Sequence, residues 1–212
     1  ICTRLGIKRE VVVGYYKNEE VIKELSRFTD VARAIAFSKK LKVAMFGNNM
    51  RDVAVTDGDR VESEIKYGWN VNYYGIGDLV KLIEGVSDSE VEAKMAEYEA
   101  KYTFATKNID AVKEQAKYEV ALEKFIAEKS IGAFTDNFEE LNGLSQLPGL
   151  SVQNIMARGI GFGPEGDYKT SALSAVLFEM AKGRNGATGF SEDYTYDLTL
   201  GQEVELAAHM LE

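Results

Sequence analysis

The sequence predicts an α/β fold: a central Rossmann-like domain with helices around a mostly parallel sheet, followed by the start of a mostly β domain. Two patterns favour this fold class. Short apolar runs alternate with amphipathic helical stripes over most of the chain, as in α/β proteins. Beyond Gly189, apolar residues instead recur at every second position, as in half-buried strands. The 212 residues suffice for one large domain, or for one domain with parts of two others.

Four of the seven expected strands lie before residue 75. A strand-like run at residues 11–16 precedes an apolar stripe with spacings of four and three, which predicts an amphipathic helix. The stripe consists of Val21, Leu25, Phe28, Ala32 and Ile35. Further elements are expected in this order: strands at 43–47 and 53–55, a turn at 57–58, a helix at about 60–67 and a strand at about 70–74.

The middle of the chain is mostly helical. Residues 76–130 are expected to form helices, one of them with Ser87 as its N-cap. The pairs Glu90/Lys94 and Glu97/Lys101 have the helical spacing of four and predict a solvated charged face. The apolar side of a later helix consists of Tyr118, Leu122, Phe125 and Ile126. A returning strand at 131–134 and a helix from Pro148 to about Arg158 follow.

The stretch at 159–167 is the most irregular part of the chain, with four glycines and one of only two prolines, and it should be a loop. Asp167 can cap a following helix that ends near Gly183. Two alternating segments, 194–200 and 204–210, then predict a pair of strands joined by a turn at 201–202. Because the chain begins and ends close to strand-like runs, we expect it to be an internal part of a longer protein.

Composition excludes several classes of partner. No apolar run approaches the ~18–20 residues that cross a bilayer, and the first residues lack the pattern of a signal peptide, so no membrane is expected. The net charge of -9 and the absence of a basic stripe argue against nucleic acid. Cys2, the single cysteine, cannot form an intramolecular disulfide, which fits a reducing compartment and predicts the cytoplasm.

Three residues are candidates for chemistry. Glu165 lies between Pro164 and Gly166, where the backbone can present a carboxylate rather than pack it. Glu192 begins the β-rich segment, and the side chain of His209, the only histidine, points away from the apolar face of its expected strand. Two carboxylates and an imidazole suit Mn²⁺, Co²⁺ or Mg²⁺. Each residue also has a plain structural alternative: a solvated loop acid, a surface acid in a turn, and a hydrogen-bonded histidine.

Other chemistries are less well supported. The glycine-rich stretch lacks the Lys-Ser/Thr of a phosphate-binding P-loop and holds an acid where a phosphate would sit. No GxSxG nucleophile motif occurs. Trp69, Tyr73 and Tyr74 fit a β core as well as a sugar-stacking surface, and we interpret them as core.

Several blocks resemble, in order, motifs of the L-arabinose isomerase family. The blocks are FGNNMRDVAVTDGD (46–59), IKYGW (65–69), GDLV (77–80), QLPGL (146–150), GFGPEGDYKT (161–170), EDYTY (192–196) and HMLE (209–212). Such a series of blocks is far more specific than any one block alone. By this resemblance, Glu165 and Glu192 are the paired catalytic acids and, with His209, bind one Mn²⁺ ion, for which Co²⁺ or Mg²⁺ are alternatives. Phe138 matches a pocket aromatic that helps to set sugar preference.

The resemblance also implies an organisation and an activity. Residues 1–35 would be the tail of an N-terminal α/β domain, 36–185 the central α/β domain, and 186–212 the start of a β-rich C-terminal domain. The family converts L-arabinose to L-ribulose, with D-galactose to D-tagatose as a second reaction, through an enediol, and assembles as homo-oligomers, hexamers or tetramers. One histidine cannot complete a four-ligand site, so these 212 residues alone are expected to be inactive.

Two alternatives remain open at this stage: a non-catalytic sugar-binding module, and a structural part of a larger enzyme. The sequence does not decide the preferred sugar, the preferred metal, the oligomer size or which glutamate is the base.

Overall fold

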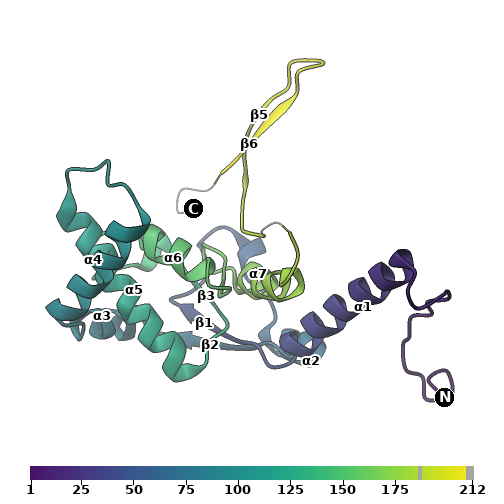
Figure 1. The fold of residues 1–212 in the computed structure, drawn as a ribbon. Helices are drawn as coiled ribbons and strands as arrows, with labels where there is room; N and C mark the ends of the chain where they lie inside the picture. The colour runs from purple at the N-terminus through teal and green to yellow at the C-terminus, as the bar shows by residue number, and fades with distance from the viewer. Residues whose placement is uncertain (186–187, 209–212) are drawn as a thin grey trace.

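The computed structural model describes residues 1–185 and 188–208, which contain a four-stranded parallel sheet at the centre of the molecule (Figure 1). The strands are β1 (Lys42–Phe46), β2 (Asn70–Tyr74), β3 (Ala133–Asp136) and β4 (Gly161–Phe162). Their order across the sheet is β2-β1-β3-β4, and all neighbours are parallel. The chain first places β2 on one side of β1 and then β3 on the other, so the topological switch point lies between β1 and β3.

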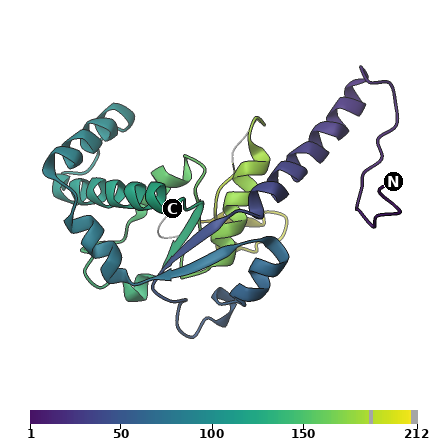
Figure 2. The ribbon, with the colours of Figure 1, turned by 90° about the horizontal axis from the view of Figure 1, so that it is seen from below.

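Helices cover both faces of this sheet (Figure 2). On one face lie α3 (Ile76–Glu84), α5 (Ile109–Lys129) and α6 (Gly149–Met156), and α4 (Asp88–Lys101) packs behind α5. On the other face α7 (Tyr168–Ala181) packs against the strands, next to α1 (Glu19–Ser38) and α2 (Arg60–Tyr67). The predicted α/β class with a parallel sheet is therefore confirmed. None of the helices in the described ranges is long and apolar enough to cross a membrane.

Strand β1 is buried on both faces. Val43 and Met45 belong to the apolar cluster under α7, whereas Ala44 and Phe46 belong to the cluster under α3, α5 and α6. All four side chains are at most 1% exposed. A strand covered on both sides has a continuous apolar sequence instead of an alternating one, which is why this run could be recognised as a strand.

Two of the expected strands are wrong. Residues 11–16 form no strand, and Val11 and Val13 are exposed. In place of the strand at 53–55 the chain forms a 3-10 helix, η1 (Ala54–Thr56). Thr56 binds the carbonyl oxygen of Val53 through its backbone N–H (3.1 Å) and its hydroxyl (2.8 Å), and these local bonds turn the chain away from the sheet.

The irregular stretch after α6 is a loop with one short strand inside it. Strand β4 pairs with Ala133 and Phe134 of β3, and its Phe162 is wholly buried. Gly161 allows the backbone of α7 to approach, because a Cβ atom at this position would lie 2.2 Å from the carbonyl oxygen of Ser171. The packing of α7 on the sheet therefore depends on a glycine that the sequence alone assigns to a loop.

Helix α1 is confirmed, but most of its apolar stripe does not face the body of the molecule. Leu25, Phe28 and Ile35 are about half exposed, at 48–53%. The helix is attached instead through Ala34, which is buried, and through Arg33, whose guanidinium donates to the last carbonyl oxygens of α7, including that of Glu179 (2.9 Å). α1 thereby satisfies the carbonyl groups that the end of α7 leaves without helical partners.

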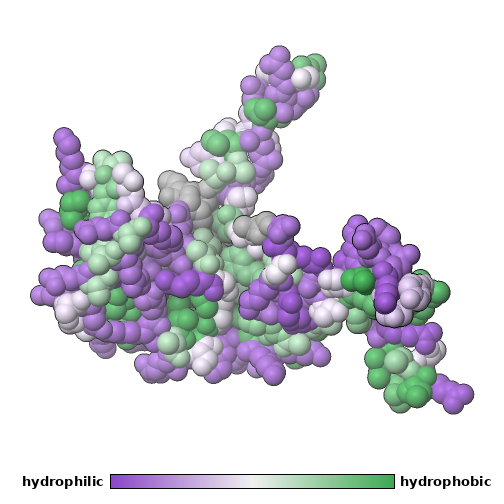
Figure 3. All heavy atoms as spheres, in the orientation of Figure 1, coloured by the Kyte–Doolittle hydropathy of each residue, from purple (hydrophilic) through white to green (hydrophobic). Residues whose placement is uncertain are grey.

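The expected pair of strands after residue 189 is confirmed as a hairpin of β5 (Asp193–Asp197) and β6 (Val204–Ala207). It projects from the body (Figure 1), and apolar and polar side chains lie side by side on its exposed surface (Figure 3). A hairpin of this kind fits the opening of a β domain. His209 lies outside the described residues, so the expected direction of its imidazole stays a prediction.

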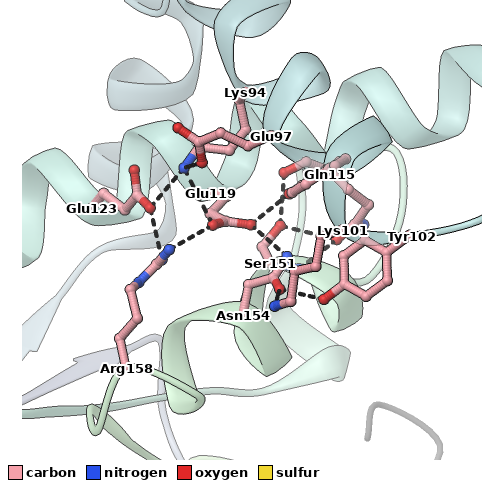
Figure 4. A network of polar contacts seen from close by, with 11 residues as sticks. Lys94, Glu97, Lys101, Tyr102, Gln115, Glu119, Glu123, Ser151, Asn154 and Arg158 are labelled. Atoms are coloured by element: carbon pink, nitrogen blue, oxygen red, sulfur yellow. Dashed lines mark hydrogen bonds and ion pairs between the residues drawn. The ribbon is translucent and has the colours of Figure 1, made fainter.

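A buried ion network joins α4, α5 and α6 (Figure 4). Glu119 on α5, whose side chain is 1% exposed, accepts hydrogen bonds from Tyr98 (2.5 Å) and Asn154 (2.9 Å). It also pairs with Arg158 (3.0 Å) and, more distantly, with Lys94 (3.4 Å). The network links the outer helix α4 to the layer that covers the sheet.

The expected solvated face on α4 is therefore wrong at Lys94. This side chain is 6% exposed and pairs with Glu123 of α5 (2.9 Å) and with Glu97 (2.7 Å) as well as with Glu119. Glu90, its expected partner, binds Lys124 instead (2.6 Å). Helical spacing indicates neighbours on one helix, but two of the three partners of Lys94, Glu119 and Glu123, belong to the next helix.

The network also sets the ionisation of its central acid. Burial alone raises the pKa of Glu119, but hydrogen bonds from Tyr98 and Asn154 and the positive charge of Lys94 outweigh it, so the pKa lies below its usual value of 4.5. Glu119 is therefore a buried carboxylate that stays ionised because its partners are in place.

Replacing Glu119 with Gln should lower the free energy of unfolding by about 2–3 kcal/mol near pH 7, since Arg158 and Tyr98 lose a charged partner. A carboxyl whose folded pKa is lowered stabilises the fold above its unfolded pKa and loses that contribution as pH falls through the folded pKa. The difference in the free energy of unfolding between wild type and variant, measured by urea titration, should therefore shrink below about pH 4.5. The matched control is Glu62→Gln, which breaks an exposed pair with Lys66 and should change little. A difference that does not vary with pH would contradict this account.

Candidate functional site

Three loops meet at the carboxyl edge of the sheet. They are residues 47–51 after β1, 137–140 after β3 and 163–167 after β4. In open parallel sheets, ligands bind beyond the carboxyl ends of the strands at the topological switch point, which here lies between β1 and β3. The loops after β1 and β3 therefore border the place where a ligand is expected.

The loop after β3 holds the loop after β1 through two adjacent carboxylates. It contains a 3-10 helix, η2 (Phe138–Glu140), in which Glu140 Oε2 accepts a hydrogen bond from the backbone N–H of Asn48 (2.7 Å). Glu139 Oε2 accepts from the backbone N–H of Arg51 (2.9 Å) and pairs with its guanidinium (3.2 Å). Gly47 permits this approach, because a Cβ atom there would lie 2.6 Å from the Glu140 carboxylate.

Glu165 is fixed by its backbone between the other two loops. Its carbonyl oxygen accepts from Met50 N–H (2.8 Å), and the N–H of Gly166 donates to the carbonyl oxygen of Asp136 (2.8 Å). Both Glu165 (φ 65°) and Gly166 (φ 75°) have left-handed backbone conformations. A non-glycine residue persists in that region only where its surroundings determine it, and such residues concentrate at functional sites.

The start of α7 holds this loop from behind. Asp167 is the N-cap, and its carboxylate accepts from the backbone N–H groups of Lys169 (3.0 Å) and Thr170 (3.1 Å). The Lys169 ammonium donates to the carbonyl oxygens of Val55 (2.6 Å) and Asp57. The predicted cap is confirmed, and the turn that replaces the expected strand at 53–55 serves as an anchor for α7.

The structure places two of the four predicted site residues at this edge. Glu165 and Phe138 are both half-buried there, on neighbouring loops. Glu192 is exposed at the base of the hairpin, where its carbonyl oxygen accepts from Ala208 N–H (2.8 Å). His209 lies beyond the described residues. Within the described ranges, no three carboxylate, thiol or imidazole groups are gathered closely enough to hold a metal ion.

Glu165 nevertheless fits the proposed kind of metal ligand. A carboxylate oxygen is a hard donor of the kind that Mn²⁺ and Mg²⁺ prefer. Its backbone is fixed on two sides, as described above. A metal site that used Glu165 would need further ligands, for which the sequence analysis names Glu192 and His209.

Sequence reasoning missed Asn137, Glu139 and Glu140. Asn137 is wholly buried, its Oδ1 accepts from Glu139 N–H (3.1 Å), and its Nδ2 finds no acceptor among the residues described. The available signal was the run of polar residues directly after a strand, because such residues reach the carboxyl edge of a parallel sheet. Only the flanking Phe138 was singled out, and that on the strength of resemblance.

Comparison with known proteins identifies the family of this chain. A family model described as the L-arabinose isomerase central domain matches residues 42–183, which include the whole sheet and all three loops. The chain belongs to the L-arabinose isomerase family. The family resemblance expected from the sequence blocks is thereby confirmed.

Individual L-arabinose isomerases are similar over the full chain. The chain is 48% identical to L-arabinose isomerase 2 of Bacillus licheniformis and to L-arabinose isomerase of Bacillus subtilis, with 100% of the chain covered in both cases. It is also 48% identical to the L-arabinose isomerase of Aeromonas hydrophila over 99% of the chain. The chain spans less than half of these relatives, at 46%, 44% and 43% of their lengths.

Gly166→Ala should disrupt the contact between the loops that flank Glu165. A Cβ atom at Gly166 would lie 2.5 Å from both Asn49 Cα and the carbonyl oxygen of Asn48, and the left-handed φ adds strain. We expect a loss of about 2–4 kcal/mol in the free energy of unfolding, measured by urea titration. Gly183→Ala is the matched control, since its φ is also left-handed (79°) but no atom lies within 4 Å. Equal losses at the two positions would show that the loops can move apart.

Proposed function

We propose that the chain forms the central part of an L-arabinose isomerase that converts L-arabinose to L-ribulose, with D-galactose to D-tagatose as a second reaction. The similarity to named L-arabinose isomerases over the full length of the chain carries the proposal. It is supported by the position of Glu165, a carboxylate fixed in a left-handed backbone at the carboxyl edge of the sheet.

The reaction defines what the residues must do. Interconversion of an aldose and a ketose moves the carbonyl group from C1 to C2, which requires a proton to leave one carbon and another to reach its neighbour, through an enediol. We assign the two roles, base and acid, to Glu165 and Glu192. Phe138, at the same edge as Glu165, would contact the sugar and contribute to the choice between pentose and hexose.

A divalent cation belongs to this proposal. Glu165, Glu192 and His209 would hold it, with Mn²⁺ as the first candidate and Co²⁺ or Mg²⁺ as alternatives. When bound, the cation stabilises negative charge that develops on the substrate oxygens. The two backbone hydrogen bonds beside Glu165 would help to orient its side chain toward the cation and the substrate.

We propose that the full-length enzyme works in the cytoplasm as a homo-oligomer. The 212 residues alone should show no isomerase activity, because a single histidine leaves the ligand set incomplete.

Glu165→Gln and Glu192→Gln in the full-length enzyme should each reduce kcat with L-arabinose by roughly 10²–10⁴-fold, because an amide cannot exchange the proton. The assay follows ketose formation with Mn²⁺ present. Glu128→Gln changes an exposed acid paired with Lys129 and should leave kcat unchanged. Near-native kcat in either site variant would remove that glutamate from catalysis. Sugar binding that persists in EDTA, with no ketose formed by wild type, would instead favour a sugar-binding module.

His209→Asn should weaken Mn²⁺ binding by roughly tenfold or more, since an imidazole ligand is lost. Isothermal titration calorimetry of metal-free enzyme with Mn²⁺ measures this directly. An unchanged Mn²⁺ affinity would show that His209 is not a metal ligand.

A further inference from the structure

We propose that Glu139 and Glu140 are positioning residues for Glu165. Neither is part of the chemistry assigned above, and both act through the backbone of the loop after β1. The proposal rests on the proposed function, because it concerns the placement of the carboxylate that this function uses.

The contacts form a closed ring that begins in the loop after β3 and returns to the last residue of β3. Glu140 and Glu139 bind the backbone N–H groups of Asn48 (2.7 Å) and Arg51 (2.9 Å). Between these two, the N–H of Met50 donates to the carbonyl oxygen of Glu165 (2.8 Å). The next residue, Gly166, returns to the carbonyl oxygen of Asp136 (2.8 Å), just before η2.

This ring explains how Glu165 is kept in a left-handed conformation. That conformation is unfavourable for a residue with a side chain and lasts only under constraint from neighbouring structure. One constraint, from Asp136, comes directly from a buried strand. The other comes from Met50, and the two carboxylates bind the N–H groups of Asn48 and Arg51 on either side of it.

Carboxylates suit this role better than neutral acceptors. A hydrogen bond from a backbone N–H to an ionised oxygen is shorter and stronger than one to a neutral oxygen. The Glu139 side chain is 19% exposed but the Arg51 guanidinium at 3.2 Å is 68% exposed, so this ion pair adds little and the bond to the backbone N–H is the main contact. Both ends of the 48–51 segment are thus fixed around the N–H that contacts Glu165.

The same ring of contacts also determines the position of Phe138. Phe138 is the first residue of η2, directly before the two glutamates, and Asn137 caps this short helix through the N–H of Glu139 (3.1 Å). Displacing Glu139 and Glu140 should therefore move Phe138 and Glu165 together. The ring thus couples the position of Phe138, which would contact the sugar, to the position of the Glu165 carboxylate.

The test uses the full-length enzyme with Glu139→Ala, Glu140→Ala and the corresponding Gln variants. Because Gln keeps one acceptor oxygen, we expect it to restore most of what Ala removes. In the Ala variants we expect kcat on L-arabinose and Mn²⁺ affinity to fall roughly 10–100-fold, as for other residues that orient a metal ligand. KM should change less than kcat. Glu128→Ala, an exposed acid outside the ring, serves as the control.

Two results would overturn the proposal. One is Ala variants whose kcat and Mn²⁺ affinity stay within about twofold of wild type. The other is a lowered melting temperature with unchanged kcat for each folded active site, because that is the behaviour of a purely structural residue.

Failure of the proposed function gives a different result. In that case wild type itself would form no ketose, and amide hydrogen exchange would then decide the positioning role. We expect the N–H of Met50 to lose protection in Glu140→Ala and to keep it in Glu140→Gln. If the Met50 N–H kept its protection from hydrogen exchange in both Ala variants, the positioning role would be wrong, whatever the activity.

Discussion

Burial of β1 on both faces is the constraint on which the rest of the structure depends. Val43 and Met45 require cover on one side of the sheet and Ala44 and Phe46 on the other, so helices must form on both faces. The chain must also pass from one side of β1 to the other between β2 and β3. This passage makes the loops after β1 and β3 border one crevice, so the location of the candidate site follows from the packing of a single strand.

Much of the fold could be predicted because local patterns determine it. The helix at 60–67 and the strand at 70–74 have the expected bounds, since Asp59 caps the helix and left-handed Gly68 ends it. The failures share a cause. Val53–Val55 has the composition of a strand, but Thr56 offers a competing local bond. Lys94 has a charge pattern typical of a surface, although two of its partners lie on α5. Such partners are tertiary and leave no periodic signal.

The candidate site was predictable only in part, for the same reason. Glu165 could be singled out from the irregular stretch around it, and resemblance pointed to Phe138. Glu139 and Glu140 look like ordinary surface acids in sequence, and their role depends on backbone N–H groups that lie about 90 residues earlier in the chain. Backbone donors have no residue identity, so a contact of this type cannot be recognised before the fold is known.

Gly161 limits which positions of this protein can be substituted. Because α7 lies against the bare backbone of β4, any side chain at position 161 would push the helix outward, and the N-cap Asp167 with the adjoining Glu165 loop would follow. Sequence variation in the sheet beneath α7 is thereby coupled to the geometry of the carboxyl edge. A library aimed at the candidate site should hold positions 161, 139 and 140 constant and diversify Phe138, whose side chain is half-buried.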